Sequence, residues 1–348
     1  MCDESGLVTL TRELIQRLPK AELHVHLDGC LRPATMLDLA KDQCVKLPAD
    51  TPDGLAEAMF VRNASSLEEY LERYIVTVSV MQTAEALERI AYEFVHDAAA
   101  DNVRYVEVRY CPALHVPAVS WTQAVEAPLS GIKRAEEETG TTVRLIVSAL
   151  RTLAPEVSYD LARLAVDYRS EGVIAFDLAG AERGHAARDH VRAFEYALGH
   201  GLSCTCHAGE GDGPESIRQA LHVCGASRLG HGTRLLEDPE LEAEVVERQV
   251  PLEVCLTSNL HTHTVLDIAE HPAGGYFERG VKMTLNTDSR LMDQTTVSEE
   301  LWLAHEKLGF TRQQLEKVIL DAFRAAFLPD EEKAALFNRV EAELKEIQ

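Results

Sequence analysis

The sequence predicts an α/β protein built as a (β/α)8 TIM barrel, with a helical lid inserted after the first strand and extra helices at the C-terminus. From Val103 onward, short apolar runs alternate with helical patterns, which is typical of a parallel sheet with crossover helices. Together with an opening strand, these runs number eight, the count that closes such a barrel. An open doubly wound sheet is the runner-up, but no run is followed by the Gly-rich phosphate turn of that fold.

The elements are expected in the following order. Residues 7–19 are expected to form a lead-in helix closed by Pro19, and the stretch Ala21–Gly29 begins with the first strand. Helical patterns then run from Pro33 to about Cys44, and through Met59, Tyr70 and Met81 to Ala100, which forms the expected lid. The other strands are expected at 103–109, 142–149, 172–178, 202–207, 228–231, 251–256 and 281–286. Helices are expected at 121–139, 156–170, 186–200, 214–224, 238–248 and throughout 297–347. Without a linker or a repeat, residues 1–348 are expected to form a single domain.

Composition narrows the class of partner. The 348 residues include 34 basic and 57 acidic side chains, giving a formal charge of −23. Such a charge repels nucleic acid and anionic membranes and fits a small-molecule substrate. Eight cysteines are scattered singly, which indicates reduced thiols rather than a disulfide framework. No secretory signal and no bilayer-spanning apolar run is found, so a cytoplasmic location is expected.

The first strand carries two histidines two residues apart, His24 and His26. Side chains on a strand alternate between faces, so both imidazoles point the same way. Two imidazoles on one face are half of a zinc site. Two ordinary strand-end histidines are the alternative interpretation of this spacing.

Polar residues gather where other predicted strands end, which in a barrel is the face that carries the active site. His207 follows the fifth strand and Asp288 follows the eighth. With His24 and His26 they supply four zinc ligands of acceptable type. Taken singly, His207 could be a hydrogen-bonded strand-end histidine and Asp288 an Asx turn. Their joint arrangement favours the metal site.

Three further residues are candidates for catalytic, electrostatic or structural roles beside the metal. Glu210 lies in a Gly-flanked turn just past His207, where it could donate or accept a proton or instead cap the next helix. His231 stands between two glycines and is interpreted as a base or electrostatic partner near the metal. Asp177 is expected to hold a structural hydrogen bond rather than a catalytic role.

Two other motifs are given structural interpretations. If His207 faces the barrel axis, Cys204 and Cys206 face the strand–helix layer as small buried thiols. His261 and His263 follow the seventh strand in a region without strand pattern. They are expected to lie in a polar loop at the pocket rim, with metal binding as the weaker alternative.

In these residues the chain resembles the adenosine deaminases, a family of the metal-dependent amidohydrolase superfamily. The resemblance covers residues from Pro19 to about 325. It is carried by the motifs Lys20–Gly29, Phe176-Asp177-Leu178-Ala179-Gly180, His207-Ala208-Gly209-Glu210, Gly230-His231-Gly232 and Leu285-Asn286-Thr287-Asp288. The order and spacing of these motifs make the resemblance specific.

The resemblance implies one zinc ion per chain, held by His24, His26, His207 and Asp288. It implies hydrolytic deamination of adenosine and 2′-deoxyadenosine to inosine and 2′-deoxyinosine with release of ammonia, a purine salvage reaction. The metal would lower the pKa of water from about 15.7 to about 7.

The resemblance also implies the roles of the residues around the substrate. His231 and Asp288 would orient the attacking water and accept its proton, and Glu210 would protonate ring N1. The Gly180 backbone would contact N3. Asp28 would reach the ribose 5′-hydroxyl with help from His26.

One residue departs from the family pattern. Adenosine deaminases commonly carry a second aspartate after the zinc-binding one, in contact with purine N7, whereas this chain has Ser289. A serine hydroxyl also donates but is shorter and neutral. Asp28, by contrast, is shorter than the glutamate typical of related adenine deaminases and leaves room for ribose.

The alternatives to adenosine are therefore adenine, a 5′-modified adenosine or an N6-substituted purine. A catalytically silent binding protein on the same fold is the third alternative. In the lid, Met59, Phe60 and Leu67 are candidate pocket-wall residues, although their helical spacing also fits core positions.

Overall fold

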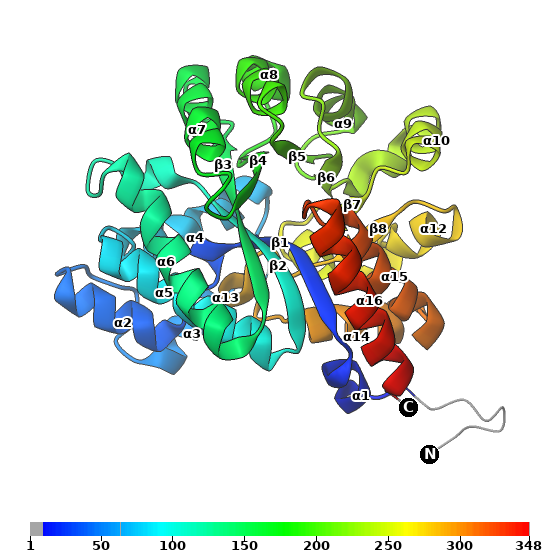
Figure 1. The fold of residues 1–348 in the computed structure, drawn as a ribbon, viewed down its shortest axis with the longest axis horizontal. Helices are drawn as coiled ribbons and strands as arrows, with labels where there is room; N and C mark the ends of the chain where they lie inside the picture. Colours follow the sequence, from blue (N-terminus) through cyan, green and yellow to red (C-terminus); the bar gives the residue numbers. More distant parts are fainter. Residues whose placement is uncertain (1–9, 63, 348) are drawn as a thin grey trace.

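The computed structural model describes residues 10–62 and 64–347. Its eight strands pair in sequence order from β1 to β8, and every pairing is parallel. The strands are β1 Lys20–His26, β2 Val103–Tyr110, β3 Thr142–Leu150, β4 Val173–Ala179, β5 Ser203–Ala208, β6 Arg228–His231, β7 Leu252–Val254 and β8 Met283–Leu285. Helices surround them, with α7 to α10 on one side and α14 to α16 beside β1 in Figure 1. The predicted barrel is confirmed.

The barrel closes between its first and last strands through a short seam. Val25 and Asp288 form a parallel bridge. The Asp288 amide donates to the His24 carbonyl at 3.0 Å, and the Asp288 carbonyl accepts from the His26 amide at 2.7 Å. The Leu23 amide adds a bond to the Asn286 side chain at 2.8 Å. Three of the four predicted metal ligands therefore lie on the closing seam.

The expected lid consists of four helices between β1 and β2. These are α2 Pro33–Asp42, α3 Pro52–Met59, α4 Leu67–Ser79 and α5 Ala84–Ala100. A hydroxyl side chain begins each of the last three, because Thr51, Ser66 and Thr83 accept a hydrogen bond from the amide three residues on. The lead-in helix is α1 Arg12–Arg17, and positions 7–9 of its prediction lie outside the described residues.

The remaining helices follow the later strands along the chain. They are α6 Trp121–Thr139, α7 Pro155–Asp167, α8 Val191–Gly199, α9 Pro214–Arg218, α10 Pro239–Arg248, α11 Leu256–His261, α12 Ala273–Glu278, α13 Arg290–Asp293, α14 Val297–Leu308, α15 Arg312–Ala325 and α16 Asp330–Glu346. Single turns and short 3₁₀ or π segments connect several of them: Leu27–Gly29, Pro112–Leu114, Ala187–His190, Gln219–Val223, Thr233–Glu237 and Ile268–Glu270.

The seventh unit differs from its prediction. The expected strand 251–256 ends at Val254, and the expected loop after it begins with helix α11. A short apolar run such as Val254-Cys255-Leu256 fits either a strand or a buried helix, and periodicity alone does not separate the two. The helix turns Ser258 and Asn259 inward, where both are fully buried.

Other expectations concern the thiols and the membrane. Seven cysteines lie within the described residues and all are free; Cys44 is exposed and the other six are buried. Cys2 lies outside the described residues. Cys204 and Cys206 belong to the hydrophobic core, as expected from their parity with His207. Among the described helices, none combines the length and the apolar character needed to span a bilayer.

Candidate active site

A cavity of about 550 Å³ opens at the C-terminal ends of the strands. Its inner wall comes from the strand ends and includes His26, Asp28, Gly180, His207, Glu210, His231 and Asp288. Its outer wall comes mainly from α4, through residues such as Leu67, Tyr74 and Ile75. The barrel therefore provides the polar floor, and the lid provides a side that is mostly apolar but also carries Glu68 and Glu72.

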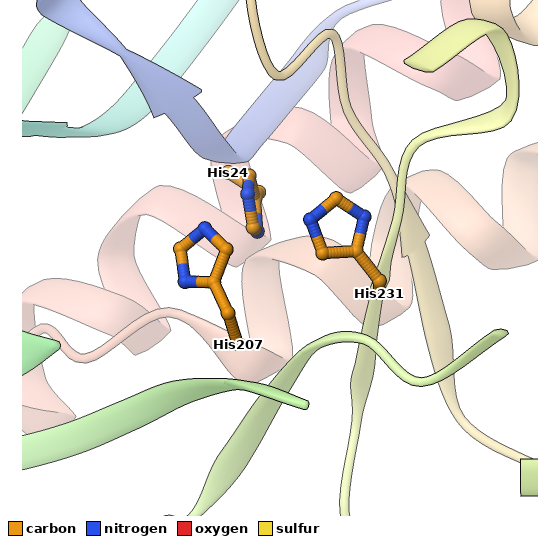
Figure 2. A group of neighbouring side chains, drawn as sticks. All are labelled: His24, His207 and His231. Carbon is orange, nitrogen blue, oxygen red and sulfur yellow. The ribbon is translucent and has the colours of Figure 1, made fainter. Parts of the chain in front are cut away.

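Four predicted ligands converge at the base of this cavity. The Asp288 Oδ1 lies 3.6 Å from His24 Nε2 and 3.4 Å from His26 Nε2. His26 Nε2 and His207 Nε2 are 3.1 Å apart, and the rings of His24 and His207 lie 4.5 Å apart. Figure 2 shows His24, His207 and His231 with their rings turned toward a common point.

The donor set fits a metal ion of the zinc type. His24 Nε2 is buried and has no hydrogen-bond partner among the described residues, although buried polar atoms are normally paired. Two imidazole nitrogens as close as those of His26 and His207 either share a proton or bind one cation. Three imidazoles and one carboxylate are ligands that zinc accepts. These residues could therefore hold such an ion.

Carboxylates behind the imidazoles fix the orientation of two rings. Glu253 Oε2 lies 2.8 Å from His24 Nδ1, and Asp177 Oδ1 lies 3.1 Å from His207 Nδ1. Such partners leave Nε2 free for the metal and raise the basicity of the ring. Burial alone would raise the pKa of Asp177, but His207 and Arg109 hold that pKa below its ordinary value. Asp177 has the hydrogen-bonding role expected from the sequence.

Beneath the site, a buried ionic network supports Glu253. Arg109 donates to its Oε2 at 2.8 Å and Arg228 to its Oε1 at 2.7 Å. Arg228 also pairs with Glu107. All four side chains are at most 1% exposed, so removing one partner would leave an uncompensated buried charge. The sequence interpretation missed this network, although charged residues inside apolar strands were a signal for it.

Glu210 faces the cavity and lies beside His231. Its Oε2 is 3.5 Å from His231 Nε2, and its Oε1 has no hydrogen-bond partner within the described part of the chain. Burial raises the pKa of Glu210 well above its ordinary value, and the nearby carboxylates of Asp288 and Glu182 raise it further. A carboxyl group kept neutral in this way is suited to donate a proton.

The His231 ring is held by Asn259 on α11. Asn259 Nδ2 lies 3.2 Å from His231 Nδ1, so the amide donates to that nitrogen and the ring proton is assigned to Nε2. Burial and the neighbouring His24 lower the pKa of His231 well below its ordinary range. The ring is therefore neutral at pH 7, with Nε2 directed toward Glu210 and Asp288.

His231 and Asp288 share an uncommon backbone conformation. Both have φ of +61°, in the left-handed region that non-glycine residues seldom occupy. Such strain costs about 1–3 kcal/mol and is found mainly where the surrounding structure enforces it, as at active sites. For Asp288, the enforcing contacts are the seam hydrogen bonds to His24 and His26.

The remaining predicted substrate residues differ in their access to the cavity. Asp28 lines it, its Oδ1 has no partner among the residues that the structure describes, and burial raises the pKa of Asp28 to about 7. Gly180 lines it with φ of +90°. Ser289 is fully buried, and its hydroxyl is hydrogen-bonded to the Tyr74 hydroxyl at 2.5 Å. Tyr74, rather than Ser289, is among the described residues that line the cavity.

The three candidate pocket-wall residues of the lid also differ in their access to the cavity. Leu67 lines the cavity, whereas Met59 is fully buried in the hydrophobic core. Phe60 packs its ring against His261 at 5.4 Å. His261 in turn contacts Asp293 at 2.7 Å.

The second His-x-His pair does not join the metal site. Within the described residues, the potential metal-binding groups combine His24 with His207 and His231, His24 with Cys255 and Asp288, and Glu210 with His231 and Asp288. Neither His261 nor His263 belongs to them; His26 does not belong to them either, but its Nε2 lies 3.4 Å from the Asp288 carboxylate. Neither histidine is among the described residues that line the cavity, and His261 lies in a helix rather than the expected loop.

Imidazoles and carboxylates gathered at the C-terminal face of a parallel barrel define the class of metal-assisted hydrolases. A family model described as adenosine deaminase matches residues 19–343. An adenosine deaminase from Mycobacterium sp. (strain JLS) is 43% identical over 352 residues, covering 95% of this chain and 96% of that protein. The chain belongs to the adenosine deaminase family and is an enzyme of that family.

Solved structures show the same architecture. A zinc-bound amidohydrolase from Burkholderia ambifaria has a TM-score of 0.86 at 26% identity and covers 99% of this chain and 97% of its own. The N6-mAMP deaminase of Arabidopsis has a TM-score of 0.84 at 28% identity, covering 95% of this chain and 99% of its own. The fold is thus shared with a zinc-bound amidohydrolase and with a deaminase named for N6-mAMP.

Proposed function

We propose that this enzyme uses one zinc ion per chain to deaminate adenosine and 2′-deoxyadenosine, releasing ammonia and giving inosine and 2′-deoxyinosine. The observation that carries the proposal is the convergence of four ligand-type side chains beside Glu210 at the base of one cavity. The family to which the chain belongs supports the same reaction.

His24, His26, His207 and Asp288 would hold the zinc ion. When bound at such a site, zinc lowers the pKa of water from about 15.7 to about 7, which supplies the nucleophile at neutral pH. The orienting carboxylates Asp177 and Glu253 keep the imidazoles in place. A zinc-bound relative of the same fold supports the choice of metal.

The other residues act on the substrate and on protons. Glu210 holds a proton on its carboxyl group and delivers it to ring N1, which weakens the aromatic bonding at C6 where attack occurs. His231 donates a hydrogen bond from Nε2 that orients the attacking water, and Asp288 orients the same water and accepts its proton. Asp28 accepts a hydrogen bond from the ribose 5′-hydroxyl, and the Gly180 backbone contacts N3.

The cavity favours a nucleoside over a nucleotide. Its described lining residues include the acids Asp28, Glu68 and Glu72 but neither Lys nor Arg. A phosphate group needs positive charge or several N–H donors, and these acids would repel it. AMP and N6-methyl-AMP are therefore expected to be poor substrates, unlike in the Arabidopsis relative named for that nucleotide.

Recognition of the purine imidazole edge differs from the family pattern at Ser289. Because Ser289 lies behind Tyr74, we assign the contact with N7 to the Tyr74 hydroxyl, which Ser289 holds in place. Because of this difference at Ser289, we keep a second candidate function, which is deamination of another 6-aminopurine such as adenine or an N6-substituted adenosine.

The free thiols of the described cysteines fit a reducing compartment such as the cytoplasm.

The test is a substrate panel on zinc-loaded protein with its metal content measured. Adenosine, 2′-deoxyadenosine, adenine, N6-methyladenosine and AMP are compared by kcat/KM from the fall in ultraviolet absorbance. The expected result is a large preference for the two nucleosides. A preference for adenine or an N6-substituted compound would establish the second candidate. No turnover of any compound by zinc-loaded protein would indicate a binding protein.

A further inference from the structure

The carboxylate of Glu182 accepts hydrogen bonds from four consecutive main-chain amides around the proton donor. Its Oε1 accepts from Gly209 at 2.7 Å, and its Oε2 accepts from Glu210 at 3.0 Å, Gly211 at 2.7 Å and Asp212 at 3.0 Å. Glu182 is only 3% exposed. We call these four amides and the carboxylate the Glu182 clamp.

The main chain at 209–212 has the form of an anion-binding concavity. Successive N–H groups point to one centre, as in the nests that bind phosphate and other anions. Gly209 permits this turn with φ of +74°, and a Cβ there would lie 2.5 Å from Ile217 Cδ1. Here the protein provides its own anion. A carboxylate accepts at both oxygens and donates at neither, so it satisfies all four amides.

The Glu182 clamp restrains the main chain around Glu210. Glu210 lies between two glycines, whose backbones rotate more freely than those of other residues. Its side chain provides little restraint, because Oε1 has no hydrogen-bond partner in residues 10–62 and 64–347 and Oε2 is 3.5 Å from His231. The position of the carboxyl group is therefore set mainly through its main chain.

The clamp also joins the proton donor to the cavity wall. Glu182 follows Gly180 and Ala181, and both of these line the cavity. One short segment after β4 thus forms the wall beside the purine and holds the turn that carries Glu210. We propose that Glu182 is a positioning residue that fixes Glu210 at the distance and angle needed for proton transfer to the base. This inference rests on the proposed deaminase function.

The first test is the Glu182→Gln variant. The amide keeps the size of the side chain but replaces one acceptor oxygen with an NH₂ group that opposes the main-chain amides. Because misplacement by about 1 Å can cost about 100-fold in rate, kcat is expected to fall about 10- to 100-fold, with KM and metal content unchanged. Glu237→Gln removes an exposed acid, paired with Arg234, and serves as the control with wild-type kcat.

The second test is chemical rescue. Glu182→Ala leaves the four amides without an anion and creates a space that formate fits. Added formate is expected to restore kcat in a saturable way, whereas chloride at equal ionic strength does not. Glu210→Gln, whose defect lies in the proton itself, is expected not to respond. A role in folding alone would lower the melting temperature without such a rescue of kcat.

The outcomes separate this inference from the proposed function. If the wild-type enzyme does not deaminate any panel substrate, the proposed function fails. If it does, two results would overturn the positioning role. One is wild-type kcat in a folded, metal-loaded Glu182→Gln enzyme, and the other is a Glu182→Ala enzyme whose kcat does not respond to formate. Should neither of these variants fold, Glu182→Asp, with its shorter reach, must show a lower kcat at unchanged KM; wild-type kcat there also overturns it.

Discussion

Asp288 contacts His24 twice, once through the main chain and once through the side chain. Its amide donates to the His24 carbonyl at 3.0 Å, and its carboxylate lies 3.6 Å from His24 Nε2. The same pair of residues closes the barrel and contributes to the proposed metal site. Metal binding and barrel closure should therefore be coupled.

Removal of the metal is expected to loosen this seam. A ligand present at about 1,000 times its Kd stabilises the folded state by about 4 kcal/mol, so chelation should lower Tm. Hydrogen exchange should accelerate at the amides of His26 and Asp288 more than between β2 and β3, which are far better paired. Restoring zinc should reverse both changes. Uniform acceleration across the barrel would contradict the coupling.

Glu210→Gln should abolish nearly all turnover while leaving the fold and the metal in place. An amide has no proton to give at neutral pH, and general acid catalysis contributes about 10²–10⁴-fold. kcat for adenosine, with zinc measured in the same sample, checks this. Glu237→Gln is again the charge-matched control. Substantial activity in the metal-loaded variant would remove Glu210 from the proton-donor role.

Tyr74→Phe should weaken binding of the purine through loss of one hydrogen bond. A neutral hydrogen bond contributes about 1 kcal/mol, so KM for adenosine is expected to rise about fivefold. The matched substrate is 7-deazaadenosine, which lacks N7 and should bind both enzymes alike. Equal losses for the two substrates would mean that the Tyr74 hydroxyl does not contact N7.

Asp28→Asn should affect only substrates that carry a 5′-hydroxyl. Above pH 7, where Asp28 is ionised, it presents to the cavity a buried oxygen with no partner among the described residues. Hydrogen bonds to charged groups contribute about 1.5–3 kcal/mol. kcat/KM for adenosine is expected to fall about 10- to 100-fold. The same variant should treat 5′-deoxyadenosine much as the wild type does. A comparable loss for both nucleosides would place Asp28 elsewhere in the mechanism.

The stability of the protein should depend on pH through Glu300, a buried acid on α14. Burial raises its pKa from 4.5 to about 7, although Thr257 and Thr295 donate to it. Between these values the folded state keeps a proton that the unfolded chain has released. Stability therefore falls as pH rises through this window, by up to about 3 kcal/mol, and the loss is complete above pH 7.

Glu300→Gln removes this titration. Compared with the wild type, the variant should gain stability at pH 8 relative to pH 5, as measured by urea unfolding at both values. Glu299→Gln, an exposed neighbour, should change stability equally at both. A gain from Glu300→Gln that is the same at pH 5 and pH 8 would contradict the raised pKa.

Periodicity predicted most of the fold, because alternating strands and helices impose patterns that can be read locally. All eight strands were located, and β6 matches its prediction at both ends. The prediction for the seventh unit was wrong at the end of its strand, because Leu256–His261 adds apolar and small polar residues that suit either a strand or a helix. There the decision comes from packing, with Asn259 turned inward to reach His231.

The sequence by itself determined the types of side chain at the strand ends, and with them the proposed ligand set and proton donor. Those residues follow strands, and parallel strands bring their carboxyl ends to one face. Only the tertiary structure decided which residues hold these side chains in place. Glu253 contacts the His24 ring, Ser289 is hydrogen-bonded to Tyr74, and Glu182 accepts from the Glu210 amide. Each of these contacts joins residues 28 to 229 positions apart. No local pattern encodes such contacts, because they depend on the register and packing of the closed barrel.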